Sequence, residues 1–314
     1  MHLVEVSNLR VDYDEITAVQ GLSFQLKAGQ IYGFVGPNGA GKTSTIKTIA
    51  GVIEPTEGDI FLNGLNLETE REKALATVGY MPDFSPVYEN LKVWEYLDVF
   101  AAAYSIERNK RKDKISEWLN KVNLLSKKDA FIKGLSRGMR QRLVLAKTLI
   151  NDPQILLLDE PASGLDPISR KEMRDVVKEA SNRGAAVLIS SHILTELSEF
   201  IDSVIILEKG HLVIEGSIEE IRNKTGLSQK VMIRFLNEQK ALPVFERLLN
   251  TFGITNERVK CDRSNYVVHF INRGDEAAHF LKEVLNSGID LSEFSLKKDD
   301  VEDIFFKLGT KEVA

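Results

Sequence analysis

The segment from Val35 to Ile46, VGPNGAGKTSTI, constrains the fold of this chain more than any other stretch. Gly36, four further residues, Gly41, Lys42 and Thr43 have the spacing of a phosphate-binding loop. Residues with little side chain let successive backbone N–H groups surround a polyphosphate at the positive end of the helix that follows. An apolar run precedes the segment and a helical pattern follows it, so a nucleotide site is favoured over a glycine-rich turn without a ligand.

The residue types within the loop predict how it would hold a nucleotide. Lys42 would supply a positive charge to the outer phosphates. Thr43 would supply a hydroxyl group to Mg²⁺, a cation that binds through few protein ligands. The predicted nucleotide-binding residues of the loop are Gly36, Pro37, Asn38, Gly39, Ala40, Gly41, Lys42, Thr43 and Ser44.

Two acidic residues end the apolar run QILLLDEP. If this run is a strand of the same sheet, Asp159 and Glu160 lie at the edge where a nucleotide phosphate would bind. Asp159 suits the Mg²⁺ shell, and Glu160 suits a general base that polarises the attacking water. A buried strand that merely has an acidic end is the alternative, and the phosphate-binding loop makes it the weaker one.

Hydrophobic periodicity predicts an α/β fold followed by a second domain. Apolar strands at 31–35, 155–158, 185–189 and 204–207 alternate with helix-like stretches at 42–50, 139–150 and 170–180, as in a parallel sheet covered by helices. Between residues 69 and 125 the pattern becomes that of amphipathic helices, which predicts an inserted helical subdomain. From about Ser228 the expected order is strand, helix, strand, strand, helix, strand, which is that of a ferredoxin-like domain.

A second candidate anion site lies in GLSRGMRQRL. Ser136 and Gly138 can present a hydroxyl group and backbone N–H groups at the start of a helix. Ser136 could also be only a helix cap. Because one triphosphate already has its own loop, a second anion site suggests that two chains share each nucleotide.

In these motifs the chain resembles the nucleotide-binding subunit of an ATP-binding-cassette (ABC) transporter. GPNGAGKT, GYMPD, LSRGM, LLLDEP, SGLD and SSHI occur in that family's order across residues 1 to about 220. The resemblance implies that Tyr13 stacks on adenine, that Asp166 belongs to a nucleotide-contacting loop, and that His192 is a catalytic switch residue. It also implies that the Ser136 and Gly138 segment of one subunit closes on ATP held by a second copy.

The resemblance implies a P-loop NTPase cassette over residues 1–226, with a parallel-sheet core, an antiparallel β subdomain and a helical subdomain at about 84–150. Residues 227–314 would form a small α+β accessory or regulatory domain. Two positions depart from the family pattern. Arg137 replaces a common glycine, which we expect to be tolerated because Gly138 follows. Asp83 replaces a common glutamine, so it would approach Mg²⁺ through a water molecule, face the membrane partner, or be a solvated loop residue.

GYMPD, LSRGMRQRL and the ending VEDIFFKLG resemble the type 2 export branch, in which the membrane-spanning subunit is a separate polypeptide. The expected partners are therefore a transmembrane permease and a second ATPase subunit, with ATP and Mg²⁺ as cofactors. The groove near 83–94 would contact the permease. A net charge of −5 argues against nucleic acid as a partner. With one cysteine and no visible signal peptide or membrane span, we expect a cytoplasmic protein on the inner face of the cell membrane.

Two rival functions remain open at this point. One is a soluble ABC ATPase that moves no solute, although such proteins usually have two cassettes, long coiled-coil insertions or cysteine ligands. The other is a regulated ATPase scaffold built around the second domain. Co-purification with a membrane protein would separate the three functions.

Overall fold

The computed structural model describes residues 2–192, 197, 200–218, 220–221, 228–255, 259–262, 265–271 and 274–298. The chain divides into two compact units, Met1–Ser217 and Ile218–Ala314. The boundary predicted between residues 226 and 227 lies outside the described residues. The segment VEDIFFKLG, whose sequence resembles the type 2 export branch, lies outside them as well.

A six-stranded sheet forms the centre of the first unit, with the strand order β10-β9-β3-β8-β7-β6. Five strands run parallel, and β10 pairs antiparallel with β9. The strands are β3 (Ile31–Val35), β6 (Val78–Met81), β7 (Ile155–Leu158), β8 (Ala186–Ser191), β9 (Ser203–Glu208) and β10 (His211–Ser217). Because β3, β7 and β8 are parallel neighbours, the segments that follow them emerge at one edge of the sheet.

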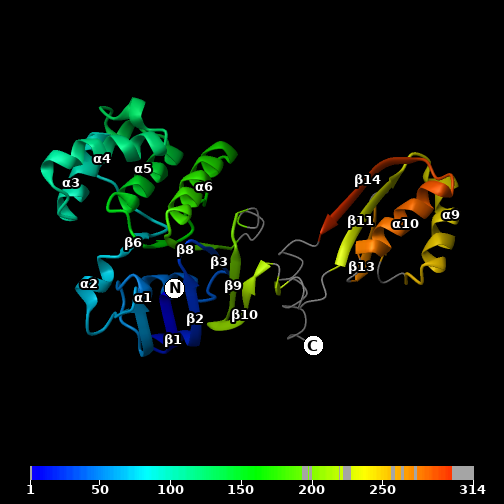
Figure 1. Ribbon diagram of the computed structural model, residues 1–314, viewed down its shortest axis with the longest axis horizontal. Helices are drawn as coiled ribbons and strands as arrows, with labels where there is room; N and C mark the ends of the chain where they lie inside the picture. Colours follow the sequence, from blue (N-terminus) through cyan, green and yellow to red (C-terminus); the bar gives the residue numbers. More distant parts are fainter. Residues whose placement is uncertain are drawn as a thin grey trace. The chain divides into compact units, whose positions relative to one another are not determined.

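The central strands are apolar along their whole length because both faces of this sheet are covered. Every residue of β3, β7 and β8 is buried. The helices of this unit include α1 (Lys42–Ile49), α5 (Arg137–Leu149) and α6 (Pro167–Asn182); α1 lies on one side of the sheet, and α5 and α6 lie on the other (Figure 1). The predicted α/β architecture is confirmed.

One segment of the predicted helical region is a strand. Val78–Met81 forms β6 at the edge of the sheet and pairs in parallel with Ile155–Leu158. A run of only four residues has no periodicity that separates a strand from a helix, so the sequence pattern at 69–125 could not predict this strand. The remainder contains α2 (Arg71–Leu75), α3 (Val93–Ala103) and α4 (Arg108–Lys121).

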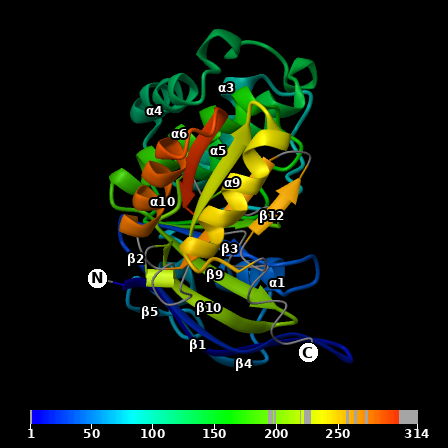
Figure 2. The same ribbon diagram turned by 90° about the vertical axis from the view of Figure 1, so that its right-hand side faces the viewer.

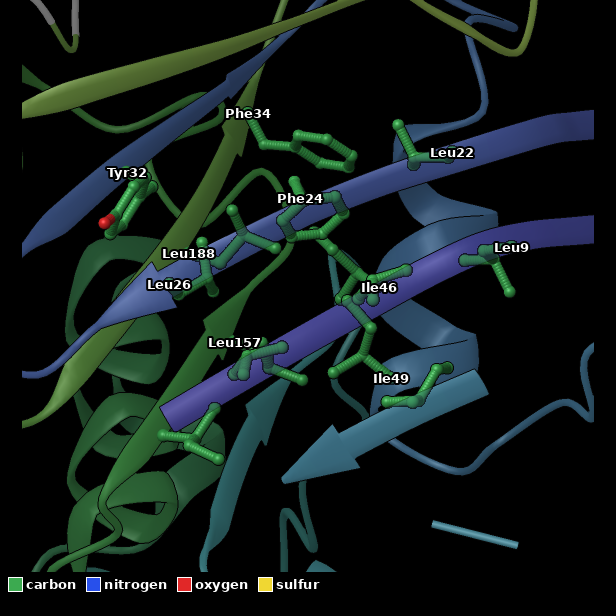
Figure 3. Close-up of a cluster of buried hydrophobic side chains, with 14 of the residues drawn as sticks. Leu9, Leu22, Phe24, Leu26, Tyr32, Phe34, Ile46, Ile49, Leu157 and Leu188 are labelled. Atoms are coloured by element: carbon green, nitrogen blue, oxygen red, sulfur yellow. The ribbon is translucent and has the colours of Figure 1, made fainter. Parts of the chain in front are cut away.

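A second, antiparallel sheet completes the first unit, in the order β2-β1-β4-β5. Its strands are β1 (His2–Tyr13), β2 (Ile16–Lys27), β4 (Glu57–Leu62) and β5 (Leu65–Asn66). A buried cluster joins this sheet to α1 and to the large sheet (Figure 3). In it, the rings of Phe24 and Phe34 lie 5.9 Å apart, with Ile46 of α1 also fully buried. Packing of this kind fixes β2 and α1 beside the end of β3.

The second unit has the predicted ferredoxin-like order. Its elements are β11 (Ser228–Phe235), α9 (Glu238–Thr251), β12 (Val259–Asp262), β13 (Asn265–Ile271), α10 (Gly274–Asn286) and β14 (Leu291–Lys298). The strands form an antiparallel sheet in the order β12-β13-β11-β14, and both helices cover one face of it (Figure 2). Phe245 and Phe280 are fully buried between the helices and the sheet, so this unit has a hydrophobic core of its own.

No helix in the described parts of either unit is long and apolar enough to cross a membrane.

Candidate active site

The glycine-rich loop connects β3 to α1, as its sequence predicts. Gly41 caps α1 with φ 99°, a left-handed conformation that glycine adopts without strain. A Cβ atom at this position would also lie 2.5 Å from the carbonyl oxygen of Ala18 on β2. Glycine is therefore required at position 41 by both conformation and space. The α1 N-terminus thereby directs its first backbone N–H groups toward the loop.

Lys42 is held inside this loop by the loop's own backbone. Its Nζ donates hydrogen bonds to the carbonyl oxygens of Gly36 (2.6 Å) and Pro37 (3.1 Å). The side chain is buried, and burial lowers the pKa of Lys42, while the nearby Glu160 and Asp159 act in the opposite direction. The ammonium group is thus fixed at the position where a phosphate-binding loop needs a positive charge.

Asp159 follows β7 and is 1% exposed. Its Oδ1 accepts hydrogen bonds from Thr43 Oγ1 (3.2 Å) and Ser190 Oγ (2.7 Å). Its Oδ2 is buried and has no hydrogen-bond partner among the described residues. A buried carboxylate oxygen without a partner is costly, and it is the ligand type that Mg²⁺ prefers. Thr43 and Asp159 together are therefore residues that would hold a Mg²⁺ ion.

Glu160 and His192 come from the adjacent strand ends of β7 and β8. Glu160 Oε2 lies 2.9 Å from His192 Nδ1. Since an ionised carboxylate only accepts hydrogen bonds, Nδ1 is the donor, and the imidazole orients the carboxylate. Glu160 has a φ of 46°, which is uncommon for a residue other than glycine and frequent at functional sites.

Ser190 also belongs to the site, although it is not among the residues predicted from the sequence. Its Oγ donates to Asp159 and accepts a hydrogen bond from the backbone N–H of Glu160 at 2.9 Å. It therefore fixes both acidic residues relative to β8. The only signal in the sequence is its place two residues before His192 in SSHI.

Several of these groups line an open pocket of about 540 Å³, whereas the predicted residues Gly36, Pro37 and Asp159 are not part of its described lining. The predicted residues that line it are Tyr13, Asn38, Gly39, Ala40, Gly41, Lys42, Thr43, Ser44, Asp83, Glu160 and His192. Four further lining residues were not predicted: Ile16, Thr17, Ala18 and Ser163. Tyr13 and Ile16 are both largely exposed, so an aromatic and an aliphatic surface are available to a flat apolar group such as a base.

The pocket's described lining does not include Ser136, Gly138 or Asp166. Ser136 caps α5, and its Oγ accepts a hydrogen bond from the N–H of Met139 at 3.3 Å. Asp166 caps α6 by accepting from the N–H groups of Ile168 and Ser169, and these bonds hold the pKa of its carboxyl group below the usual range. In a single chain Ser136 and Asp166 thus have structural roles as helix caps.

Comparison with known proteins gives concordant matches. The family model described as ABC transporter matches residues 19–163. The bacitracin transport ATP-binding protein BcrA of Bacillus licheniformis is 32% identical over 307 residues, covering 98% of this chain and 97% of BcrA. YcbN of Bacillus subtilis, an ABC transporter ATP-binding protein, is 32% identical over 310 residues, with the same coverage. Nod factor export ATP-binding protein I of Burkholderia orbicola is 36% identical over 214 residues, covering 68% of this chain and 70% of that protein.

Solved structures agree with the fold of the first unit. An ATP-binding subunit of an ABC transporter superposes with a TM-score of 0.66 and 30% identity, covering 71% of this chain and 93% of that structure. A nucleotide-free ATP-binding cassette from an ABC transporter superposes with a TM-score of 0.63 at 22% identity, covering 71% of this chain and 94% of that structure.

Proposed function

This chain belongs to the family of ABC transporter ATP-binding proteins, ATPases that power transport, and we propose that it drives export through a separate membrane-spanning subunit. The observation that carries the proposal is the pocket in which Lys42, Thr43, Glu160 and His192 face one space. One relative supports the direction of transport, since it is named for Nod factor export. BcrA, which matches nearly the whole chain, is named for bacitracin transport and supports a transport function.

The chemistry assigned to each residue follows from its place in the pocket. Lys42 and the loop N–H groups bind the phosphates of ATP. Thr43 and Asp159 would hold Mg²⁺, which would supply positive charge to the phosphates. Glu160 polarises the attacking water, and His192 keeps its carboxylate in position.

A second copy of the chain completes the ATP site in this proposal. Ser136 and Gly138 lie at the N-terminus of α5, outside the lining of their own pocket. A helix N-terminus binds anions, so this segment can close on the phosphates held by another copy. Two copies would then face each other in a symmetric pair and enclose two nucleotides.

The proposed contact face for the membrane-spanning subunit comprises the exposed aromatic residues Phe84, Tyr88, Trp94 and Phe131. Phe84 is 83% exposed and Tyr88 is 60% exposed. The backbone brings 131 next to this segment, because Lys92 and Phe131 form a β-bridge. Aromatic side chains are enriched at protein interfaces, so exposed ones in this region are candidates for contact with a partner. The chain would bind there from the cytoplasmic side of the membrane.

Purification of the complex from membranes, followed by reconstitution into vesicles, tests the proposed function. We expect the membrane-spanning subunit to co-purify with the chain and to raise its ATPase rate, and Phe84→Ala with Tyr88→Ala to abolish both effects. Val52→Ala, at an exposed apolar position outside this face, serves as the control. An ATPase that neither binds nor responds to a membrane protein would favour the two rival functions, a non-transport ABC ATPase or a regulated scaffold.

Asp83 lines the pocket, which supports a role near the metal. We propose that its carboxylate acts on the Mg²⁺ shell through a water molecule. Replacing Asp83 by Asn or Ala is then expected to raise the Mg²⁺ concentration for half-maximal hydrolysis by about tenfold, as for other groups that act on a metal indirectly. Magnesium titrations of the two variants measure this. If both titrate like the parent but lose stimulation by the membrane subunit, Asp83 contacts that subunit instead.

The second unit is proposed to be an accessory domain that ATP chemistry does not require. Its core is built from its own elements, and the residues that line the ATP pocket precede it. A chain truncated after Gly226 is expected to retain the ATPase activity of the full chain in a phosphate-release assay. A truncated chain that folds, as judged by circular dichroism, but has no activity would contradict this separation.

A further inference from the structure

The N-terminal turns of α5 hold the loop 161–166, which directly follows Glu160. Arg137 donates a hydrogen bond from its guanidinium group to the carbonyl oxygen of Ser163 at 3.1 Å. Gln141 donates from Nε2 to the carbonyl oxygen of Pro161, also at 3.1 Å. The helix therefore binds the loop through two backbone carbonyl groups, which every sequence at those loop positions would present.

The guanidinium group of Arg137 also packs directly on Gly164. A Cβ atom built on Gly164 would lie 2.6 Å from Cζ of Arg137, and the residue has a φ of 67°. Only glycine allows both this backbone conformation and this approach. Arg137 therefore contacts the loop in two ways, through packing of its planar guanidinium group on Gly164 and through the hydrogen bond to Ser163.

A third contact fixes the far end of the same loop. Gly138 packs against Ser169 so closely that an added Cβ would lie 2.6 Å from the Ser169 Oγ. That hydroxyl group donates a hydrogen bond to Asp166, the last residue of the loop, at 2.9 Å. The start of α5 and the loop are thus held at three points and are expected to move together.

This loop is part of the ATP pocket of its own chain. Ser163 lines the pocket, and its N–H donates to the carbonyl oxygen of Glu160 at 3.1 Å. The other end of the connection, the N-terminus of α5, is the segment proposed above to close on a nucleotide held by a second copy. The contact between α5 and the loop would therefore link the sites of two different nucleotides.

We propose that Arg137 is a positioning residue that couples the two ATP sites of the dimer. When α5 of one copy engages the nucleotide of the other copy, Arg137 draws the loop 161–166 along and aligns Glu160 for hydrolysis in its own pocket. This inference rests on the proposed function, because it requires two copies that share nucleotides. Arg137, which stands where the family commonly has glycine, would thus have a role in the reaction.

The test compares Arg137→Gln and Arg137→Lys with Arg183→Gln in the full-length chain. Arg183 is an exposed arginine at the end of α6 that pairs with Glu179, so its replacement controls for loss of a surface charge. ATPase rates are measured against ATP concentration for each variant. ATP-dependent association is measured by light scattering for each substitution combined with Glu160→Gln.

In Arg137→Gln we expect kcat to fall about tenfold, since small misplacements of a reacting group have effects of this size or larger. The Hill coefficient should fall from near two, its limit for two coupled sites, to about one. The ATP concentration for half-maximal association should stay the same. Arg137→Lys should recover part of kcat, because lysine can donate to Ser163 but lacks the planar surface on Gly164. Arg183→Gln should match the parent.

Normal association with unchanged kcat and Hill coefficient in Arg137→Gln would overturn this inference alone. Loss of association in that variant would also overturn it, because Arg137 would then act on the nucleotide of the other copy directly. A parent chain that does not associate with ATP would overturn the proposed function and this inference with it. If Arg137→Gln fails to fold, Arg137→Lys is judged by the same two quantities.

Discussion

Glu160→Gln is expected to lower steady-state ATP hydrolysis by about a thousandfold, within the range that a general base contributes. Glutamine keeps the shape of the side chain and can still pair with His192, but it cannot accept a proton from water. The affinity for ATP should be unchanged, because Glu160 acts on the transition state and Lys42 on the bound phosphates. Phosphate release and equilibrium ATP binding measure the two effects separately.

Glu57→Gln is a matched control for this substitution. Glu57 lies on β4, is largely exposed and does not belong to the described lining of the ATP pocket. The Glu57→Gln chain should hydrolyse ATP at the rate of the parent chain. Undiminished turnover in Glu160→Gln would show that another group activates the water.

Lys42→Ala is expected to weaken ATP binding by about a hundredfold, equivalent to about 3 kcal/mol. The loss combines the charge-assisted interaction with the phosphates and the two hydrogen bonds that Lys42 makes to Gly36 and Pro37. Titration calorimetry with ATP measures the change. Hydrolysis should fall in parallel, because the nucleotide is no longer held.

Lys47→Ala provides the corresponding control, because Lys47 lies in the last turn of the same helix and does not line the pocket. It tests whether loss of any positive charge on α1 weakens binding. If Lys42→Ala binds ATP as tightly as Lys47→Ala does, the loop does not hold phosphates in the proposed way.

The conformation of the glycine-rich loop was predictable from sequence because it depends on local spacing. Gly36, Gly41 and Lys42 act through backbone conformation and short-range geometry, both of which the order of residues determines. The acidic pair after β7 was predictable for a similar reason, since parallel strands end at a common edge. The first feature depends on a few consecutive residues, and the second on a general rule of parallel sheets.

Other features depend on contacts between distant segments, and the sequence contains little signal for them. β6 is too short for its four residues to show a strand pattern, and its place depends on pairing with β7. Ser190 is one of two consecutive serines, and only its hydrogen bonds to the acidic pair distinguish it. Arg137 could be described from sequence only as a tolerated replacement, because its role depends on a loop that begins 24 residues later in the chain.

Light scattering of the Glu160→Gln chain tests whether two copies associate around ATP. Without ATP the protein should be a monomer, and addition of ATP should convert it to a dimer, because ligand binding at a shared site drives assembly. Adding Ser136→Arg should keep it monomeric, since a bulky cation then occupies the N-terminus of α5. Ser126→Arg, at another exposed serine, should still dimerise.

Loss of the Ser136 cap costs about 1 kcal/mol, so thermal unfolding must first show that the Ser136→Arg chain is folded. For a folded chain we expect a dimer only when both ATP and Ser136 are present. A dimer of the same mass with and without ATP, unaffected by Ser136→Arg, would contradict the shared site and would place the association in residues 228–314.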